Sequence, residues 1–460
     1  MALDKLRKFI KNNWLYLLLI LSVIALAFFI RWHNLWTYNT YWADDGGAHI
    51  DYWRILTEHH RLPALSETYL AWHEPIYYLI LALWGSFGHI LGYNGLNWLE
   101  SLNIVFYGLF LGLVWLISYF FSQKNKWVSL ANFFLFSVLF VGVKLSAYIN
   151  NELLNQLLIL LLVFLFYHWG LLSVGKIKRV FFWSIILGLA ALVKITALII
   201  FLAVIFVWFI YFLKTRQRFL LKYILLCLGL VCLINLPWVV YKNNHYRGYF
   251  SINIYDAKPH QNLLTSDAWQ YIFAVNTHIF SDYPYWYSQP NSYFSILLSD
   301  SFGDYYNLFN VGTEYLPTSE RILTGNGRYS TQQLWQTMIN TNRIALLIVA
   351  VWWLGFLWWL VDVFKNKKID GYDFFLVIVL LGGWSATLYH NLRLPYLEAG
   401  VLKAHFIYFT YPLLALLAYR QWWQVWKNKI WRFMIIFAPI IIYIFLAWQI
   451  LLARAYVIIL

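Results

Sequence analysis

Residues 14–30 read WLYLLLILSVIALAFFI, and residues 41–53, a short way beyond them, read YWADDGGAHIDYW. The first stretch is apolar throughout and is long enough to cross ~30 Å of hydrocarbon as one helix. No small-residue cleavage site comes before Arg31, so we interpret this stretch as a retained membrane span and not as a signal peptide. Adjacent carboxylates directly beyond a span are costly unless they face water, so Asp44 and Asp45 predict a polar site beside the first helix.

The composition places the whole chain in the class of polytopic helical membrane proteins. Of its 460 residues 62% are hydrophobic, and apolar stretches of span length recur along the chain. The net charge of +14 does not indicate a nucleic-acid partner, because the basic residues are dispersed between apolar stretches and form no single face. The sequence has no P-loop, dinucleotide-binding fingerprint, HExxH or paired CxxC motif, which disfavours an ATPase, a dehydrogenase and a zinc enzyme.

The basic clusters predict the topology, because short loops rich in Lys and Arg stay in the cytoplasm. These clusters lie at 5–11, 124–126, 176–179, 214–222, 365–368 and 420–432. All of them reach one side if the chain crosses the bilayer about eleven times, within a range of about 10–13, with its N-terminus in the cytoplasm. The predicted spans are 14–30, 99–121, 128–147, 153–171, 181–193, 197–213, 223–241, 343–364, 374–389, 402–419 and 433–452. Most acidic residues then face the extracytoplasmic side of a bacterial or archaeal plasma membrane or of the endoplasmic reticulum, and we expect the active site there.

Two apolar stretches need a different interpretation. Residues 75–91 cannot cross without moving the basic cluster at 124–126 to the outside, so we expect a re-entrant or interfacial helix there. Residues 180–213 must cross twice, with a turn near Lys194, because basic clusters flank both ends. A helix over 181–193 rises only ~20 Å, which leaves Lys194 below the outer surface. An ammonium group at that depth requires an anionic partner.

The chain divides into three parts. Residues 1–241 form an N-terminal membrane module, which includes an external loop, 31–98, with juxtamembrane helices. Residues 242–342 are an external segment of about a hundred residues, rich in Tyr, Asn, Ser and Asp, which we expect to pack over the membrane part as a lid. Residues 343–460 hold the C-terminal membrane helices.

Several short motifs follow one another along the chain. They are Asp44-Asp45-Gly46-Gly47, His73-Glu74-Pro75-Ile76-Tyr77-Tyr78, Asn150-Asn151-Glu152, the turn from Gly188 to Lys194, Ser301-Phe302-Gly303-Asp304 and Lys403-Ala404-His405-Phe406. In this order the chain resembles the GT-C class of integral membrane glycosyltransferases, which includes the protein O-mannosyltransferases, the lipid A aminoarabinose transferases and the catalytic subunits of oligosaccharyltransferase. Two motifs depart from the family pattern. The first loop of the family usually has Asp-Glu or Asp-x-x, and a proline stands where this chain has Glu74.

The resemblance implies an all-α GT-C fold and a glycosyltransferase of the EC 2.4 class. Its donor would be a polyprenyl-phosphate sugar and its acceptor a glycan, a lipid or a protein. The resemblance also implies inversion at the anomeric carbon, with Asp44 or Asp45 as the general base; which of the two stays open. Cations must meet the charge of the leaving phosphate. The candidate substrate- and phosphate-binding residues are His49, His73, Glu74, Asn151, Glu152, Lys194, Asp304, Arg393, Lys403 and His405.

Simpler roles for the same residues stay open at this point. Asp44 and Asp45 could simply cap the helix that begins near Gly46. Asn151 and Glu152 could cap the fourth crossing in the same way. Lys194 could extend its side chain to the membrane interface instead of binding an anion.

No tightly bound cofactor is predicted. Asp44, Asp45 and Glu152 would suit a divalent metal ion through their oxygen atoms, but Asn150-Asn151-Glu152 is a weaker ligand set than an Asp-x-Asp motif. Two alternative functions also stay open. One is a multi-pass transporter, for which inverted repeats would be expected, and the other is a glycan ligase or polymerase of another fold.

Overall fold

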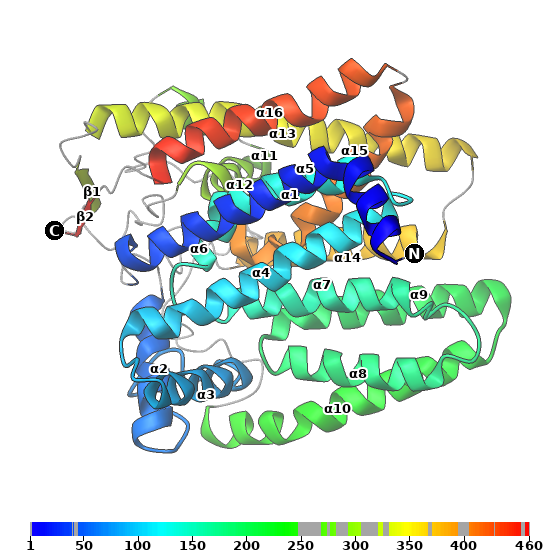
Figure 1. Ribbon diagram of the computed structural model, residues 1–460. Helices are drawn as coiled ribbons and strands as arrows, with labels where there is room; N and C mark the ends of the chain where they lie inside the picture. The colour runs from blue at the N-terminus through cyan, green and yellow to red at the C-terminus, as the bar shows by residue number, and fades with distance from the viewer. Residues whose placement is uncertain are drawn as a thin grey trace.

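The computed structural model of the chain is a bundle of α-helices with one small two-stranded sheet (Figure 1). It describes residues 2–38, 40, 45–246, 268–273, 277–281, 293–304, 321–324, 331–366, 370–393, 404–426, 428–451 and 456–459. Asp44 and Lys403, two of the predicted site residues, lie outside the described residues.

The N-terminal module holds α1 (Ala2–Thr37), α2 (Gly46–Glu58), α3 (Ile76–Ile90), α4 (Leu96–Phe121), α5 (Lys126–Val138), α6 (Phe140–Leu145), α7 (Glu152–His168), α8 (Ile177–Ala191), the 3₁₀ turn η2 (Ile195–Ala197), α9 (Leu198–Thr215) and α10 (Phe219–His245). The external segment contains α11 (Ala268–Phe273), η4 (Thr277–Phe280), α12 (Tyr293–Phe302), β1 (Arg321–Thr324) and the first residues of α13 (Thr331–Asn366). The last part holds α14 (Gly371–Arg393), η5 (Ala404–Ile407), α15 (Thr410–Val425), α16 (Lys429–Leu451) and β2 (Tyr456–Ile459), which pairs antiparallel with β1.

Within the described residues the predicted spans fall on helices, and the predicted fold class, an all-α polytopic membrane protein, is confirmed. Among the described residues, 7 helices are long and apolar enough to cross a membrane, namely those at Asn13–Thr37, Leu96–Phe121, Ile195–Thr215, Phe219–His245, Gln332–Asn366, Gly371–Leu392 and Lys429–Leu451. The other four predicted spans fall on shorter helices: α5 with α6, α7, α8 and α15. The span predicted at 128–147 is interrupted at Leu139, whose backbone is extended (φ −62, ψ 126).

The helices of the N-terminal module run side by side, with α8 against α10 and α4 against both α5 and α7 (Figure 1). Helices α2 and α3 pack together at one end of this bundle, while the N-terminus and the α9–α10 connection lie at the opposite end (Figure 1). Basic clusters 5–11 and 214–222 are therefore at one end of the molecule, as the topology requires. Which side of the membrane that end faces stays a prediction.

Helix α3 covers the stretch that was predicted to be re-entrant or interfacial. It has 15 residues and packs against α2 and α4. Leu83 and Ile90 on its outer face are 72% and 79% exposed, and Phe87 lies between them on the same face. A short helix with one exposed apolar edge suits a position in the membrane interface.

The apolar run 180–213 is broken at the predicted place. Helix α8 ends at Ala191 and α9 begins at Leu198, with η2 between them. Lys194 lies in the connection, in extended conformation (φ −162, ψ 135). The predicted hairpin is therefore present, and its turn carries the lysine into the bundle.

Candidate active site

Three predicted site residues, from distant parts of the sequence, meet where α7 begins. The ammonium group of Lys194 donates a hydrogen bond to Oε1 of Glu152. Nε2 of His405 lies 3.5 Å from the same oxygen, and the Lys194 ammonium lies 4.9 Å from the centre of the Phe406 ring. The side chains of Lys194, Glu152 and His405 are only 13%, 7% and 13% exposed. We call Glu152, Lys194 and His405 the charge cluster.

The charge cluster contains the anionic partner that the predicted depth of Lys194 requires. An ammonium group at that depth needs an anion, and the anion in the structure is the carboxylate of Glu152. The Lys194 side chain does not extend to the membrane interface, because its ammonium group is held inside the protein by Glu152. The need for a counter-charge is met within the chain, so any role of Lys194 toward a phosphate must rest on other grounds.

The first residues of α7 bind the turn between α8 and α9. Nδ2 of Asn151 donates to the carbonyl of Val193 over 3.3 Å, and Nδ2 of Asn155 donates to Oγ1 of Thr196 over 2.9 Å. Because Asn151 and Asn155 are one helical turn apart, one face of α7 fixes the whole turn that carries Lys194.

Neither Asn151 nor Glu152 acts as the cap of α7. Asn151 precedes the helix but its side chain makes no capping hydrogen bond, and Glu152 binds Lys194. The cap is Asn150, whose Oδ1 accepts from the amide of Leu153 over 3.2 Å. The sequence motif thus marks the right place, but the capping role falls one residue earlier.

Gln156 is a site residue that the sequence did not single out. Its Nε2 donates to the carbonyl of His405 over 2.7 Å, and its Oε1 accepts from the amide of Phe409 over 2.7 Å. Gln156 therefore fixes the η5 turn against α7. A buried amide side chain one turn beyond Glu152, in an otherwise apolar helix, was the signal that could have revealed it.

A chain of buried polar rings joins α2 and α3 to this region. Nδ1 of His49 lies 2.8 Å from the hydroxyl of Tyr78, which lies 3.3 Å from Nδ1 of His73. Nδ2 of Asn151 approaches the same ring nitrogen at 3.5 Å. The ring of Tyr52 stacks on that of Tyr78 with centroids 3.6 Å apart, which orders the chain further.

Asp45 comes directly before α2, but its side chain makes no capping hydrogen bond. Its Oδ1 instead accepts from the hydroxyl of Tyr69 over 2.7 Å. Capping of α2 is therefore not the role of Asp45 in this structure. Because Asp44 lies outside the described residues, the choice between the two aspartates stays open.

Glu74 belongs to a different buried ion pair. Its Oε1 lies 3.1 Å from Nζ of Lys242, near the end of α10, and the two side chains are 2% and 3% exposed. The lysine ammonium also lies 5.5 Å and 5.3 Å from the rings of Trp72 and Trp238. Glu74 thus ties the first external loop to α10 instead of belonging to the charge cluster.

The remaining predicted residues are placed as follows. Asp304 follows α12, is fully buried, and donates its amide to the carbonyl of Ser299 over 2.8 Å. Arg393 is the last residue of α14. Among the described residues, no group of three or more His, Cys, Asp or Glu side chains could hold a metal ion. A metal site that uses Asp44 is untested, because Asp44 lies outside them.

His73 interacts electrostatically with Asp45 on one side and with Lys194 and Lys242 on the other. Its burial, followed by the nearby charges of His49 and Lys194, holds the pKa of His73 well below its usual range, while Asp45 acts in the opposite direction. Lys242 lowers the same pKa. One neutral imidazole therefore lies within electrostatic range of Asp45, of the charge cluster and of the Glu74–Lys242 pair.

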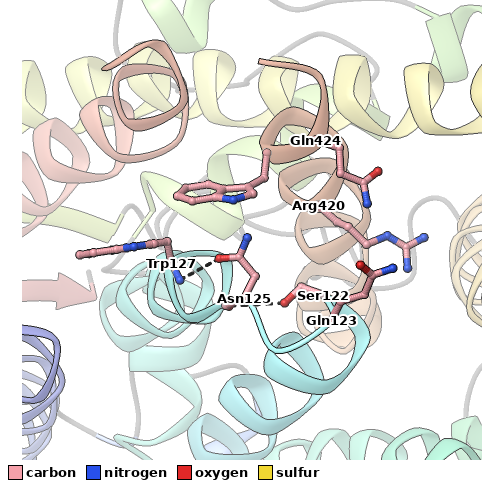
Figure 2. Close-up of a pocket in the computed structure, with 7 residues that line it drawn as sticks. Ser122, Gln123, Asn125, Trp127, Arg420 and Gln424 are labelled. Carbon is pink, nitrogen blue, oxygen red and sulfur yellow. Dashed lines mark hydrogen bonds between the residues drawn. The ribbon is translucent and has the colours of Figure 1, made fainter. Parts of the chain in front are cut away.

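A separate cavity lies at the far end of α4 from α2 and α3. It has a volume of about 380 Å³ and is lined by Ser122, Gln123, Asn125, Trp127, Arg420, Trp423 and Gln424. Figure 2 shows the side chain of Asn125 hydrogen-bonded to the backbone amide of Trp127. Through this contact Asn125 caps α5. Arg420 holds both carboxylate oxygens of Asp373, at 3.1 Å and 2.8 Å. These contacts join α4, α5, α14 and α15 at the end remote from the charge cluster.

The neutral state of His73 predicts a pH dependence of stability. The folded pKa is below the unfolded pKa of about 6.5, so the unfolded chain binds more protons as the pH falls below that value, and stability is lost. We expect the unfolding midpoint of the purified protein to drop between about pH 7.5 and about pH 5.5, and His73→Gln to flatten this slope. His59→Gln, at an exposed position, is the matched control. Equal slopes in all three proteins would contradict the assignment.

Comparisons with known proteins rest on structure alone. No family model and no curated protein matches the sequence. The Archaeoglobus fulgidus oligosaccharyltransferase in the apo form is similar with a TM-score of 0.54 and 12% identity, over 97% of this chain and 57% of that one. The oligosaccharyltransferase AglB of that archaeon, in complex with an inhibitory peptide and a dolichol-phosphate, gives a TM-score of 0.52 at 12% identity, over 96% of this chain and 56% of that one.

A third structure, ArnT from Cupriavidus metallidurans in the apo state, has a TM-score of 0.41 and 11% identity, over 89% of this chain and 78% of that one, and no argument rests on it. The chain spans a little more than half the length of the archaeal enzymes that it matches. Its integral membrane helices and this likeness give the chain a GT-C-like fold.

Proposed function

We propose that the chain transfers a sugar from a polyprenyl-phosphate carrier to an acceptor at the extracytoplasmic face of the membrane. The observation that carries the proposal is the charge cluster, which gathers Glu152, Lys194 and His405 beside the first external loop on a GT-C-like fold. A similar archaeal oligosaccharyltransferase binds dolichol-phosphate, a carrier of the proposed chemical class. The combination supports chemistry on a lipid-linked anion.

The charge cluster would bind the carrier phosphate. Glu152 holds the ammonium of Lys194 in a fixed orientation where little water reaches it. Lys194 and His405 both approach one carboxylate oxygen of Glu152, so a phosphate would bind beside this carboxylate and share the two side chains with it. Such preorganised donors stabilise the charge that develops on a leaving phosphate. Arg393 and Lys403 are further candidates for this role.

The first-loop aspartate would act as the general base. It takes the proton of the acceptor hydroxyl or amide while the acceptor forms a bond to the anomeric carbon. The bond between that carbon and the phosphate oxygen breaks on the opposite face, which inverts the anomeric configuration, and the polyprenyl phosphate leaves with the electron pair. If Asp45 is the base, the hydrogen bond from Tyr69 would orient its carboxylate.

The donor class is tested by supplying the purified protein with polyprenyl-phosphate sugar, polyprenyl-diphosphate sugar or nucleotide sugar, each with the acceptor lipids and proteins of its own membrane. We expect transfer from a lipid-linked donor only, because the sequence lacks nucleotide-binding motifs and most of its acidic residues are predicted to lie on the extracytoplasmic side. The two lipid arms separate a monophosphate from a diphosphate carrier. Direct use of nucleotide sugar would rule the proposal out.

Substitutions in the first loop test the general base. We expect one of Asp44→Asn and Asp45→Asn to lower the transfer rate by about 10²-fold or more, with unchanged abundance in the membrane, because only one of two adjacent side chains faces the acceptor. Asp51→Asn is the matched control, since Asp51 is half exposed and pairs with Arg54 on the surface of α2. If both first-loop variants keep normal turnover, the loop is structural.

Substitutions of Lys194 test the phosphate role. We expect Lys194→Met to weaken donor binding and to lower kcat by about 10²-fold, while Lys194→Arg recovers part of the activity because it keeps the charge. Lys194→Met alone leaves Glu152 buried without its lysine, so the charge-free double variant Glu152→Gln/Lys194→Met shows whether folding or phosphate binding was lost. Lys214→Met, at an exposed position, is the control. Normal donor affinity in a folded double variant would refute the role.

A further inference from the structure

A third buried ion pair lies outside the residues discussed so far. The ammonium of Lys144, near the end of α6, binds Oδ1 of Asp300 in α12, and the two side chains are 9% and 8% exposed. The other carboxylate oxygen, Oδ2, accepts a hydrogen bond of 2.6 Å from the backbone amide of Ala404. One carboxylate thus joins α6, α12 and the first residue of η5.

The turn that begins at Ala404 supplies His405 to the charge cluster and places Phe406 beside it. His405 approaches Glu152, and the ring of Phe406 lies beside the ammonium of Lys194. Gln156 holds this turn on the α7 side through the carbonyl of His405. Asp300 holds it from the other side, so the turn is fixed between two helices.

Helix α12, which carries Asp300, is held in place by neighbouring helices. Oγ of Ser301 lies 2.8 Å from the hydroxyl of Tyr411 in α15, and the carbonyl of Phe302 accepts from Tyr443 of α16 over 3.1 Å. Nδ2 of Asn342, in α13, donates to Oγ of Ser299 over 3.2 Å. The residues on both sides of Asp300 are therefore tied to three helices, α13, α15 and α16.

A buried ion pair is not by itself a strong source of stability, because the cost of removing two charges from water can exceed their attraction. What the pair does provide is a fixed orientation of the Asp300 carboxylate. Lys144 occupies one oxygen of Asp300 and leaves the second facing the amide of Ala404, and hydrogen bonds to a charged acceptor are short and strongly oriented. A pair with this geometry fixes the position of a turn.

We propose that Asp300, oriented by Lys144, is a positioning residue that places His405 and Phe406 against Glu152 and Lys194. This inference rests on the proposed phosphate role of the charge cluster. It also links the external segment, to which α12 belongs, with the transfer reaction: a movement of α12 would move His405.

Two double variants test the inference without leaving a buried charge. Lys144→Met/Asp300→Asn removes both charges but keeps an oxygen that can accept from Ala404. Lys144→Met/Asp300→Leu removes the charges and the acceptor together. The full chain is used in both cases, and equal unfolding midpoints establish that the two variants are matched in global stability.

Hydrogen–deuterium exchange over residues 404–409 measures how firmly the turn is held. Steady-state transfer from polyprenyl-phosphate sugar measures the effect of the turn on catalysis. We expect the Leu variant to exchange faster over this segment and to lose about 10²-fold in kcat, as a small misplacement of a site group does, with little change in the KM for the acceptor. The Asn variant should stay closer to the unmodified chain in both measurements.

Equal exchange in the two variants would show that Asp300 does not hold the turn. Faster exchange in the Leu variant with undiminished transfer would show that the turn is held but does not position the site, which also overturns the inference. If the unmodified chain transfers no sugar from any lipid-linked donor, the proposed function fails, and the exchange data alone decide whether Asp300 holds the turn.

Discussion

The hydrogen-bonded ion pair between Lys194 and Glu152 is the contact on which the arrangement of the site depends. The turn between α8 and α9 carries Lys194 into the protein, where its side chain is only 13% exposed. A charge in that place is tolerated only with an opposite charge beside it. Helix α7 therefore begins where its first residue, Glu152, can meet that lysine, and Asn151 and Asn155 bind the rest of the turn.

Three buried ion pairs in the described part of the chain repeat this logic over long sequence separations. Glu152 and Lys194 are 42 residues apart, Glu74 and Lys242 are 168 apart, and Lys144 and Asp300 are 156 apart. Each pair ties a segment outside the long spans to a helix or turn of the bundle. Such pairs contribute less to stability than to the choice of one arrangement among many, because the desolvation cost offsets much of the attraction. The site is accordingly built from contacts that fix position.

The helices were predictable from sequence because local signals specify them. Span length, basic loops and the break at Lys194 follow from hydropathy and charge, and the depth of Lys194 even required an anionic partner. The identity of that partner was not predictable, because nothing in the local pattern around Glu152 specifies a contact 42 residues away. Asp300 and Gln156 were missed for the same reason: each acts on the turn of His405 through the backbone, which leaves no motif.

The central claim, that the charge cluster receives the phosphate of a lipid-linked sugar, is tested most directly by the mass of the lipid that co-purifies with the protein. Native mass spectrometry of the chain in mild detergent should show a bound species with the mass of a polyprenyl phosphate that carries a sugar. The species should be lost in Glu152→Gln/Lys194→Met and retained in Lys214→Met. Retention of the same lipid by the double variant, or bound membrane phospholipids alone in the unmodified chain, would contradict the account.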